Sequence, residues 1–382
     1  MRRAFVLILV LLTAALPAGA QIGKQVAVHA GTPEDKALAQ ITVTTDPAQK
    51  LQLIEKFMAE FGKGDTALVA YDLFINHYLA AKDYAKVFEY GEKMVALDPD
   101  NFSATFLMFR AAQEKGDAEK MFELGGRIAA IVARYRQQGP PADMNEENWN
   151  GMKAAVLERT EPNLNFVEYN LFTLGYQAQD PAQKTGYLER FANAFPESQY
   201  AGYAENNLVS ISQAAQDYPK MLTYAQKALK RDPNNFSMLV LLADHWSEKG
   251  EELDKAEEFA AKAIQVLASA AKPAQVTDEQ WQQQKSLQTG LAQSALGQVH
   301  INRNDLPKAL EAFTAAKNLL ASNRMLYARN LYRLGFTLAR MNRPAEARPV
   351  LTEVVSIDSP FKALAQETLN RLGPARPPKK RP

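Results

Sequence analysis

The sequence predicts an all-α protein built as a solenoid of antiparallel helix pairs, and three observations carry this prediction. The chain contains a long internal duplication, its apolar residues follow a helical spacing, and strand signals are confined to the few residues 41–45. With 382 residues and 47% hydrophobic side chains, the chain has enough apolar surface for a repeat array or for two domains.

The duplication begins at the phrase Asp-Pro-Ala-Gln-Lys, which occurs at 46–50 and again at 180–184. The same offset holds without a gap over 46–116 and 180–250, where about 25 of the aligned positions are identical. The match resumes with a slightly shorter offset around Trp149 and Trp281, and there Lys153 corresponds to Lys285. We therefore interpret the chain as two copies of one block followed by further repeats.

Helices are predicted from apolar residues three and four apart and from the turn residues between them. Ile54, Phe57 and Phe61 form one such stripe, and an aspartate before Pro99 followed by asparagine is expected to end one helix and cap the next. Two inserted helices between repeat pairs are predicted at 144–159 and 272–288, the first after the helix-breaking Gly-Pro-Pro at 139–141.

The first twenty residues have the pattern of a secretory signal. Arg2 and Arg3 precede an apolar run over 5–16, and Ala-Gly-Ala at 18–20 supplies a cleavage site after Ala20. The alternative is a permanent membrane anchor, but a run of about 13 apolar residues is shorter than a bilayer requires. We expect an exported protein, periplasmic or secreted, without a transmembrane segment after cleavage.

The composition excludes several classes of site. There are 44 basic and 43 acidic residues, and leaving out the signal and the basic end makes the remainder slightly acidic, so no nucleic-acid partner is expected. The chain has no cysteine, which excludes a cysteine-linked lipid anchor, a thiol nucleophile and thiolate metal sites.

The predicted organisation has six segments. They are a signal peptide at 1–20, a partly loose segment at 21–45, a first duplicated block at 46–179, a second at 180–290, C-terminal helix pairs with a capping helix at 291–372, and a disordered basic tail at 373–382.

The part of the chain after residue 291 resembles tetratricopeptide (TPR) repeats. Leu296-Gly297 with Phe313 has the family's spacing of small and large residues, and Leu334-Gly335 with Leu351 repeats it 38 residues later. The resemblance extends over roughly 46–372 and implies a TPR-like α-solenoid with a concave face that is lined by the first helix of each pair.

The phrase at 194–201, Ala-Phe-Pro-Glu-Ser-Gln-Tyr-Ala, is similar to the turn in envelope TPR proteins such as outer-membrane assembly lipoproteins and cell-division coordinators. There Ser198 is expected to cap a helix, and Tyr200 to pack against the preceding helix. This chain departs from the assembly lipoproteins because it lacks their lipid-bearing cysteine.

The resemblance also implies which residues face the groove. Carried over residue by residue, these candidates for peptide binding are polar or aromatic: Asn76, Arg110, Asn206, Ser210, Asp244, Gln298, Asn302, Tyr332 and Arg340. Asparagine and glutamine suit a peptide backbone because each side chain both donates and accepts hydrogen bonds. The alternative is that these are ordinary solvated side chains.

No catalytic, cofactor or metal site is predicted. The histidines at 29, 77, 245 and 300 lack partners at metal-pair spacing, and no phosphate loop or nucleophile elbow occurs. Glu197-Ser198 is similar to the Glu-Ser pair of helical lytic transglycosylases, but the glycine-rich motifs of those enzymes are missing. Trp149 and Trp281 are interpreted as packing residues because they recur at equivalent places.

The sequence thus favours a non-catalytic adaptor that binds a protein or peptide in the cell envelope. One alternative is an architectural protein that self-associates through its inserted helices, which would make it a homo-oligomer. A second alternative is an enzyme that acts on the cell wall.

Overall fold

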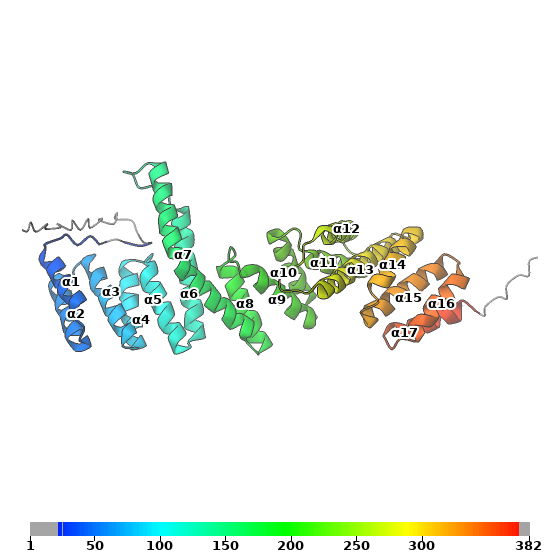
Figure 1. The fold of residues 1–382 in the computed structure, drawn as a ribbon, viewed down its shortest axis with the longest axis horizontal. Coiled ribbons are helices and arrows are strands. Elements are labelled where there is room, and N and C mark those ends of the chain that lie inside the picture. The colour runs from blue at the N-terminus through cyan, green and yellow to red at the C-terminus, as the bar shows by residue number, and fades with distance from the viewer. Residues whose placement is uncertain (1–21, 25, 374–382) are drawn as a thin grey trace, which may run out of the picture. The chain divides into compact units, whose positions relative to one another are not determined.

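The computed structural model describes residues 22–24 and 26–373, and all regular structure among these residues is helical. Seventeen helices follow one another along the described chain, without a strand (Figure 1). The predicted all-α class is therefore confirmed. The predicted signal peptide and residues 374–382 of the predicted tail lie outside the described residues.

The chain divides into two compact units, Met1–Asn207 and Leu208–Pro382, and the division falls within one helix. The helices of the first unit are α1 (Pro33–Val43), α2 (Pro47–Phe61), α3 (Thr66–Ala80), α4 (Tyr84–Leu97), α5 (Phe102–Lys115), α6 (Ala118–Gln137), α7 (Glu146–Gln177), α8 (Pro181–Ala194) and the start of α9 (Ala201–Ala214). The second unit holds the rest of α9, α10 (Tyr218–Arg231), α11 (Phe236–Lys249), α12 (Leu253–Ser269), α13 (Asp278–Asn302), α14 (Leu306–Leu319), α15 (Arg324–Arg340), α16 (Pro344–Val355) and α17 (Phe361–Arg371).

Within each unit, consecutive helices pack as pairs. α3 packs on α4, α5 on α6 and α7 on α8 in the first unit, and α11 on α12, α13 on α14 and α15 on α16 in the second. The first helices of neighbouring pairs also touch, as α3 does with α5 and α11 with α13. The predicted TPR-like stacking of helix pairs is therefore confirmed.

The two copies of the duplicated block form the same elements. α5 and α11 begin and end at equivalent residues, and each is followed by a left-handed glycine, Gly116 at φ 74° and Gly250 at φ 70°. Asn101 and Asn235 cap these helices by accepting hydrogen bonds from the backbone N–H of Ala104 and Met238. The turn chemistry predicted from the sequence is confirmed at both places.

Small residues allow the paired helices to approach closely, as the TPR resemblance implies. A Cβ atom added to Gly297 would lie 2.5 Å from a ring carbon of the buried Phe313, and one added to Gly335 would lie 2.6 Å from Leu351. The large partner thus fills the space above the glycine, so α13 packs tightly on α14 and α15 on α16.

The predicted inserted helices at 144–159 and 272–288 are not separate helices, and the second stretch becomes helical only at Asp278. The first is the start of α7, which has 32 residues, and the second is the start of α13, which has 25. α7 continues through Pro162 because buried residues anchor it on both sides, Val156 before the proline and Val167 after it. Each insertion therefore lengthens the first helix of a pair.

Trp149 and Trp281 have the packing role that the sequence predicts. Both are about 95% buried, with exposed fractions of 4% and 5%. Lys153 lies over the ring of Trp149 and donates to the Arg136 carbonyl oxygen at the end of α6, at 3.1 Å. In the second copy Lys285 lies over Trp281 and donates to the equivalent carbonyl, that of Ala268.

Parts of the segment at 21–45, predicted to be partly loose, are described by the structure. They include α1, and Ile22 is buried with an exposed fraction of 2%. The Lys24 N–H donates to a carboxylate oxygen of Asp98 at 2.7 Å, which fastens this segment to the end of α4. None of the described helices is long and apolar enough to cross a bilayer.

Candidate functional site

α7 carries two stripes of side chains on different faces. One stripe is buried against the neighbouring helices and includes Val156, Val167 and Leu171. The other is spaced by three and four residues from Glu158 to near the end of the helix and is at least partly exposed: Glu158, Glu161, Asn165, Tyr169, Phe172 and Tyr176. Its first half is acidic and its second half is aromatic, and both halves lie on one face of the helix.

The aromatic half forms an exposed surface with Tyr200 of the α8–α9 turn and Tyr203 of α9. We call the set Tyr169, Phe172, Tyr176, Tyr200 and Tyr203 the tyrosine surface. Phe172 stacks on Tyr200 with ring centroids 5.2 Å apart, and further ring contacts join all five residues. The exposed fractions of the three outer tyrosines are 53%, 53% and 64% for Tyr169, Tyr176 and Tyr203.

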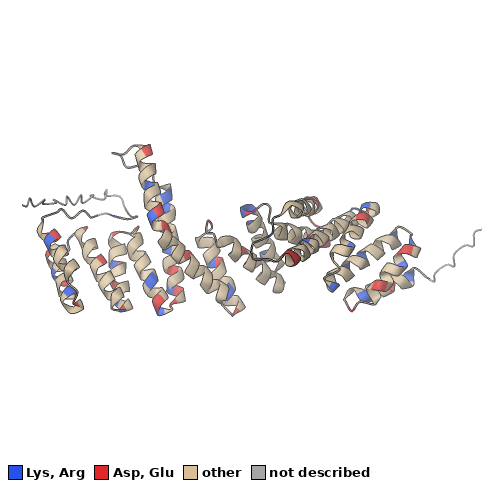
Figure 2. Cartoon of the chain, viewed as in Figure 1, with Lys and Arg blue, Asp and Glu red and all other residues tan. Residues whose placement is uncertain are grey.

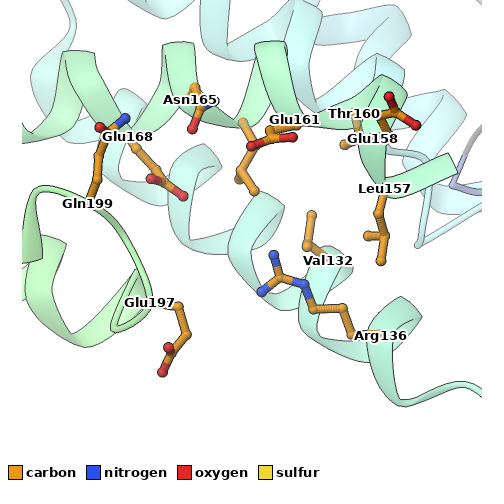
Figure 3. Close-up of a pocket in the computed structure, with 11 residues that line it drawn as sticks. Val132, Arg136, Leu157, Glu158, Thr160, Glu161, Asn165, Glu168, Glu197 and Gln199 are labelled. Atoms are coloured by element: carbon orange, nitrogen blue, oxygen red, sulfur yellow. The ribbon is translucent and has the colours of Figure 1, made fainter. Parts of the chain in front are cut away.

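The acidic half lines a pocket of about 620 Å³ between α6, α7 and the turn that joins α8 to α9 (Figure 3). We call it the acidic pocket. Its charged residues are four glutamates and one arginine, a formal excess of three negative charges: Glu158, Glu161, Glu168, Glu197 and Arg136. In Figure 3 the guanidinium of Arg136 points into the space between α7 and Glu197.

Glu168 is the buried member of the acidic pocket, with an exposed fraction of 7%. Burial raises the pKa of its carboxyl above the ordinary value, while the hydrogen bond from Ser198 and the charge of Arg136 act in the opposite direction. The Ser198 hydroxyl donates to Glu168 Oε2 at 2.7 Å. This bond ties the α8–α9 turn to α7.

The turn differs in detail from its sequence prediction. Ser198 precedes the first residue of α9 by three positions, and its hydroxyl accepts from the Tyr200 N–H at 3.2 Å, so it stabilises the turn and does not cap the helix. Tyr200 stacks on Phe172 of α7, whereas the prediction was contact with the preceding helix, α8. The α8–α9 turn thus forms one wall of the candidate site.

The tyrosine surface and the acidic pocket adjoin each other. Gln199 lines the pocket and the next residue, Tyr200, belongs to the tyrosine surface. A separate ring contact joins α7 to α5, where Phe106 meets Phe166 edge to face at 5.9 Å. Sequence analysis missed this site, although the second stripe on α7 was a usable signal, because a helix with two apolar stripes exposes one unless both are covered.

The groove residues predicted for the first unit lie on the expected first helices. Asn76 on α3 is exposed and donates to Asp72, whose pKa is raised by burial, and Arg110 on α5 forms an ion pair with Glu114 at 3.5 Å. Asn206 is half-buried on α9. None of the three belongs to the tyrosine surface or lines the acidic pocket, and their role in binding stays a prediction.

In the second unit several predicted groove residues contact other residues of the chain. Asn302 donates to the Ser247 carbonyl oxygen at 2.7 Å and accepts from Gln298, while Tyr332 stacks on Phe361. Arg340 donates to Asn304 at 2.6 Å, and Ser210 is exposed on α9. The structure therefore brings Gln298 and Asn302 together, and their role in binding also stays a prediction.

The remaining predicted residue, Asp244, belongs to a charge cluster that joins three first helices of the second unit. Arg329 of α15 donates to both carboxylate oxygens of Asp244 on α11, at 3.0 and 2.9 Å. Arg333 is 7% exposed, pairs with Glu248 of α11 and donates to Ser294 of α13. These two cations are thus neutralised within the chain, which leaves them unsuited to capture a carboxylate.

No group of three or more potential metal ligands occurs among the described residues. Burial lowers the pKa of both His77 and His245, so their neutral forms are favoured. His77 meets the Tyr78 ring edge to face, and His245 lies beside Tyr218, which are packing contacts. Figure 2 shows acidic and basic residues distributed over the helices of both units.

No protein-family model and no curated protein matches the chain. Solved structures do match at low similarity, each over 89% of this chain. A chain of the APC/C hetero-tetramer Cut9–Hcn1 has 12% identity and a TM-score of 0.40, and this chain spans 63% of its length. Yeast Tom70 has 15% identity and a TM-score of 0.27, and this chain covers 87% of its length. The TPR domain of P58(IPK) has 12% identity and a TM-score of 0.27, and this chain covers 97% of its length. Similarity at this level says nothing about function.

Proposed function

We propose that this chain is an exported, non-catalytic TPR-like adaptor that binds a protein or peptide of the cell envelope at the tyrosine surface. One observation carries the proposal. Three tyrosines on α7 and α9 leave more than half of each residue's surface in water, although aromatic contacts hold their rings in place. Rigid aromatic side chains with an apolar ring and a polar hydroxyl are favoured anchors at protein interfaces.

The proposed location rests on the first twenty residues, whose basic start, short apolar run and Ala-Gly-Ala site have the pattern of a cleaved signal. The expected mature chain begins at Gln21. Sequencing the N-terminus of protein from the periplasmic or culture fraction tests this, and full-length protein in the cytoplasmic fraction would contradict it.

The proposed binding is tested by chemical crosslinking of the protein in its own envelope, followed by mass spectrometry. Tyr169→Ser combined with Tyr203→Ser should remove most crosslinked partners, because both anchors are lost. Tyr218→Ser is the matched control, since Tyr218 is a partly exposed tyrosine outside the tyrosine surface, with an exposed fraction of 40%. An unchanged partner set in the folded double variant would contradict the proposal.

The acidic pocket favours a second candidate function, hydrolysis of a cell-wall glycan. A buried carboxyl of raised pKa beside other carboxylates is the arrangement that glycosidases use, with one residue as acid and another as base or nucleophile. Release of reducing ends from purified wall material by the mature protein, abolished by Glu168→Gln, would establish this function. We favour binding because the Glu168 carboxylate is already engaged in fastening the α8–α9 turn.

A further inference from the structure

The exposed stripe of α7 has a direction, since its acidic end and its aromatic end are separate. Glu158 and Glu161 lie in the first half of the stripe, and Tyr169 and Tyr176 lie in the second half. The other wall repeats this order, because Glu197 lines the acidic pocket and Tyr203 belongs to the tyrosine surface. A ligand that contacts both walls thus meets negative charge at one end and tyrosine rings at the other.

The tyrosine rings have the spacing that an extended, proline-containing peptide requires. Tyr169 and Tyr176 are about two helical turns apart, a rise of roughly 10.5 Å along α7. One turn of a polyproline II helix advances roughly 9.3 Å, and such peptides dock on aromatic side chains with every third residue against a ring. Tyrosine suits this role because its hydroxyl can donate to the peptide carbonyl groups, which have no internal partner.

The acidic pocket defines the charge of the same ligand. Glu158, Glu161 and Glu197 are exposed, and Arg136 is the single cation among the lining residues. A neutral ligand leaves this excess of negative charge without a partner, whereas lysine or arginine side chains would neutralise it. Cations over tyrosine rings already occur in this chain, as Lys184 lies 5.3 Å from the ring centre of Tyr176.

We infer that the tyrosine surface and the acidic pocket together bind an extended peptide segment with proline at one end and basic residues at the other. This inference rests on the proposed function and names the chemistry of its partner. The prolines lie over Tyr169, Tyr176 and Tyr203, and the basic side chains enter the pocket beside Glu158, Glu161 and Glu197. The stripe from Glu158 to Tyr176 rises roughly 27 Å, which matches about nine residues of polyproline II helix.

The chain itself supplies a probe of this chemistry. Residues 373–382 read Gly-Pro-Ala-Arg-Pro-Pro-Lys-Lys-Arg-Pro, in which a Pro-x-x-Pro sequence precedes three consecutive cations. The experiment measures binding of this synthetic decapeptide, labelled with a fluorophore, to the mature chain and to a chain shortened after Gly373. Shortening removes a competing copy of the probe sequence, so the shortened chain should bind the peptide at least as tightly as the mature chain does.

The expected results separate the two halves of the site. Replacing the prolines of the peptide by alanine, or combining Tyr169→Ser with Tyr203→Ser in the protein, should weaken binding about tenfold or more. Glu158→Lys combined with Glu161→Lys should weaken binding of the basic peptide and strengthen binding of a peptide with glutamates in place of its lysines. This exchange of preference cannot arise from loss of folding.

Three results would overturn the inference. They are equal binding of the original and the alanine peptide, no exchange of preference after charge reversal, and tighter binding of a soluble cell-wall glycan than of any peptide. Envelope partners that still crosslink through the tyrosine surface would then leave the proposed function standing. If no envelope partner crosslinks through the tyrosine surface while the decapeptide binds as expected, the proposed function fails and the peptide chemistry of the site stands.

Discussion

The Ser198 hydroxyl donates a hydrogen bond to the buried carboxylate of Glu168 at 2.7 Å, joining two segments that are 30 residues apart in the sequence. The bond holds the α8–α9 turn against α7, so it fixes the distance between the two walls of the candidate site. Glu197 and Tyr200, the neighbours of this bond on the turn, belong to the acidic pocket and the tyrosine surface. Local stability and ligand binding should therefore depend on the same contact.

Ser198→Ala tests that dependence. The substitution leaves the buried Glu168 carboxylate without its hydroxyl partner, which should lower the free energy of unfolding by about 1–3 kcal/mol. Urea unfolding followed by circular dichroism measures the change, and Ser198→Thr, which retains a hydroxyl, should lose less. Equal stabilities of the alanine variant and the natural protein would show that the turn is held by other contacts.

Glu168 also predicts how stability depends on pH. Its pKa is raised by burial, so the folded chain holds this proton more tightly than the unfolded chain. The resulting stabilisation is complete below the ordinary pKa of 4.5 and is lost as the pH rises through the raised value. Glu168→Gln should therefore reduce the loss of stability that the natural protein shows as the pH rises above 4.5. If the free energy of unfolding of both proteins depends on pH in the same way, Glu168 is not the group responsible.

The space around two helical glycines, Gly297 in the second unit and Gly151 in the first, predicts opposite effects of their substitution by alanine. Gly297→Ala should destabilise the chain by about 1–3 kcal/mol, because the new methyl group would overlap the Phe313 ring. Gly151→Ala should stabilise it by about 0.5–1 kcal/mol, since Gly151 lies in the interior of α7 with no neighbouring atom within 4 Å. Thermal melting of both variants measures the effects, and a shift of the same sign for both would refute the packing argument.

The charge cluster of the second unit predicts that replacing a largely buried arginine lowers the free energy of unfolding more than replacing an exposed one. The side chains of Arg329 and Asp244 are 16% and 24% exposed, whereas those of Arg371 and Glu367 are 74% and 58% exposed. Arg329→Met should cost about 1.5–3 kcal/mol, because it leaves Asp244 half-buried without its bidentate partner. Arg371→Met should change stability by less than about 0.5 kcal/mol. Denaturant unfolding distinguishes the two, and similar small losses would mean that the cluster is well solvated.

The fold could be predicted from the sequence because its signals are local and repeated. Asn101 and Asn235 cap equivalent helices, and Gly116 and Gly250 follow them in the same left-handed conformation, so one set of turn residues defines both copies. The length of α7 could not be predicted in this way. Pro162 normally ends a helix, and only tertiary contacts on both sides of it keep α7 continuous.

The candidate site was harder to predict, because spacing does not tell which stripe of a helix faces the core. Phe172 and Tyr176 are four residues apart, as are Val167 and Leu171, yet only the second pair is buried. The polar groove candidates were selected by their place in the repeat. That place does not reveal contacts within the chain, such as the one between Asp244 and Arg329.

A photoreactive side chain at position 203 tests the central claim most directly. The mature protein would carry it in place of Tyr203, or in place of Asn302 as a control on a predicted groove helix, and would be irradiated in its own envelope. We predict that position 203 captures a protein partner and that position 302 captures little, because Tyr203 lies in the tyrosine surface and Asn302 bonds to Ser247. Capture at position 302 with none at position 203 would contradict this account of the site.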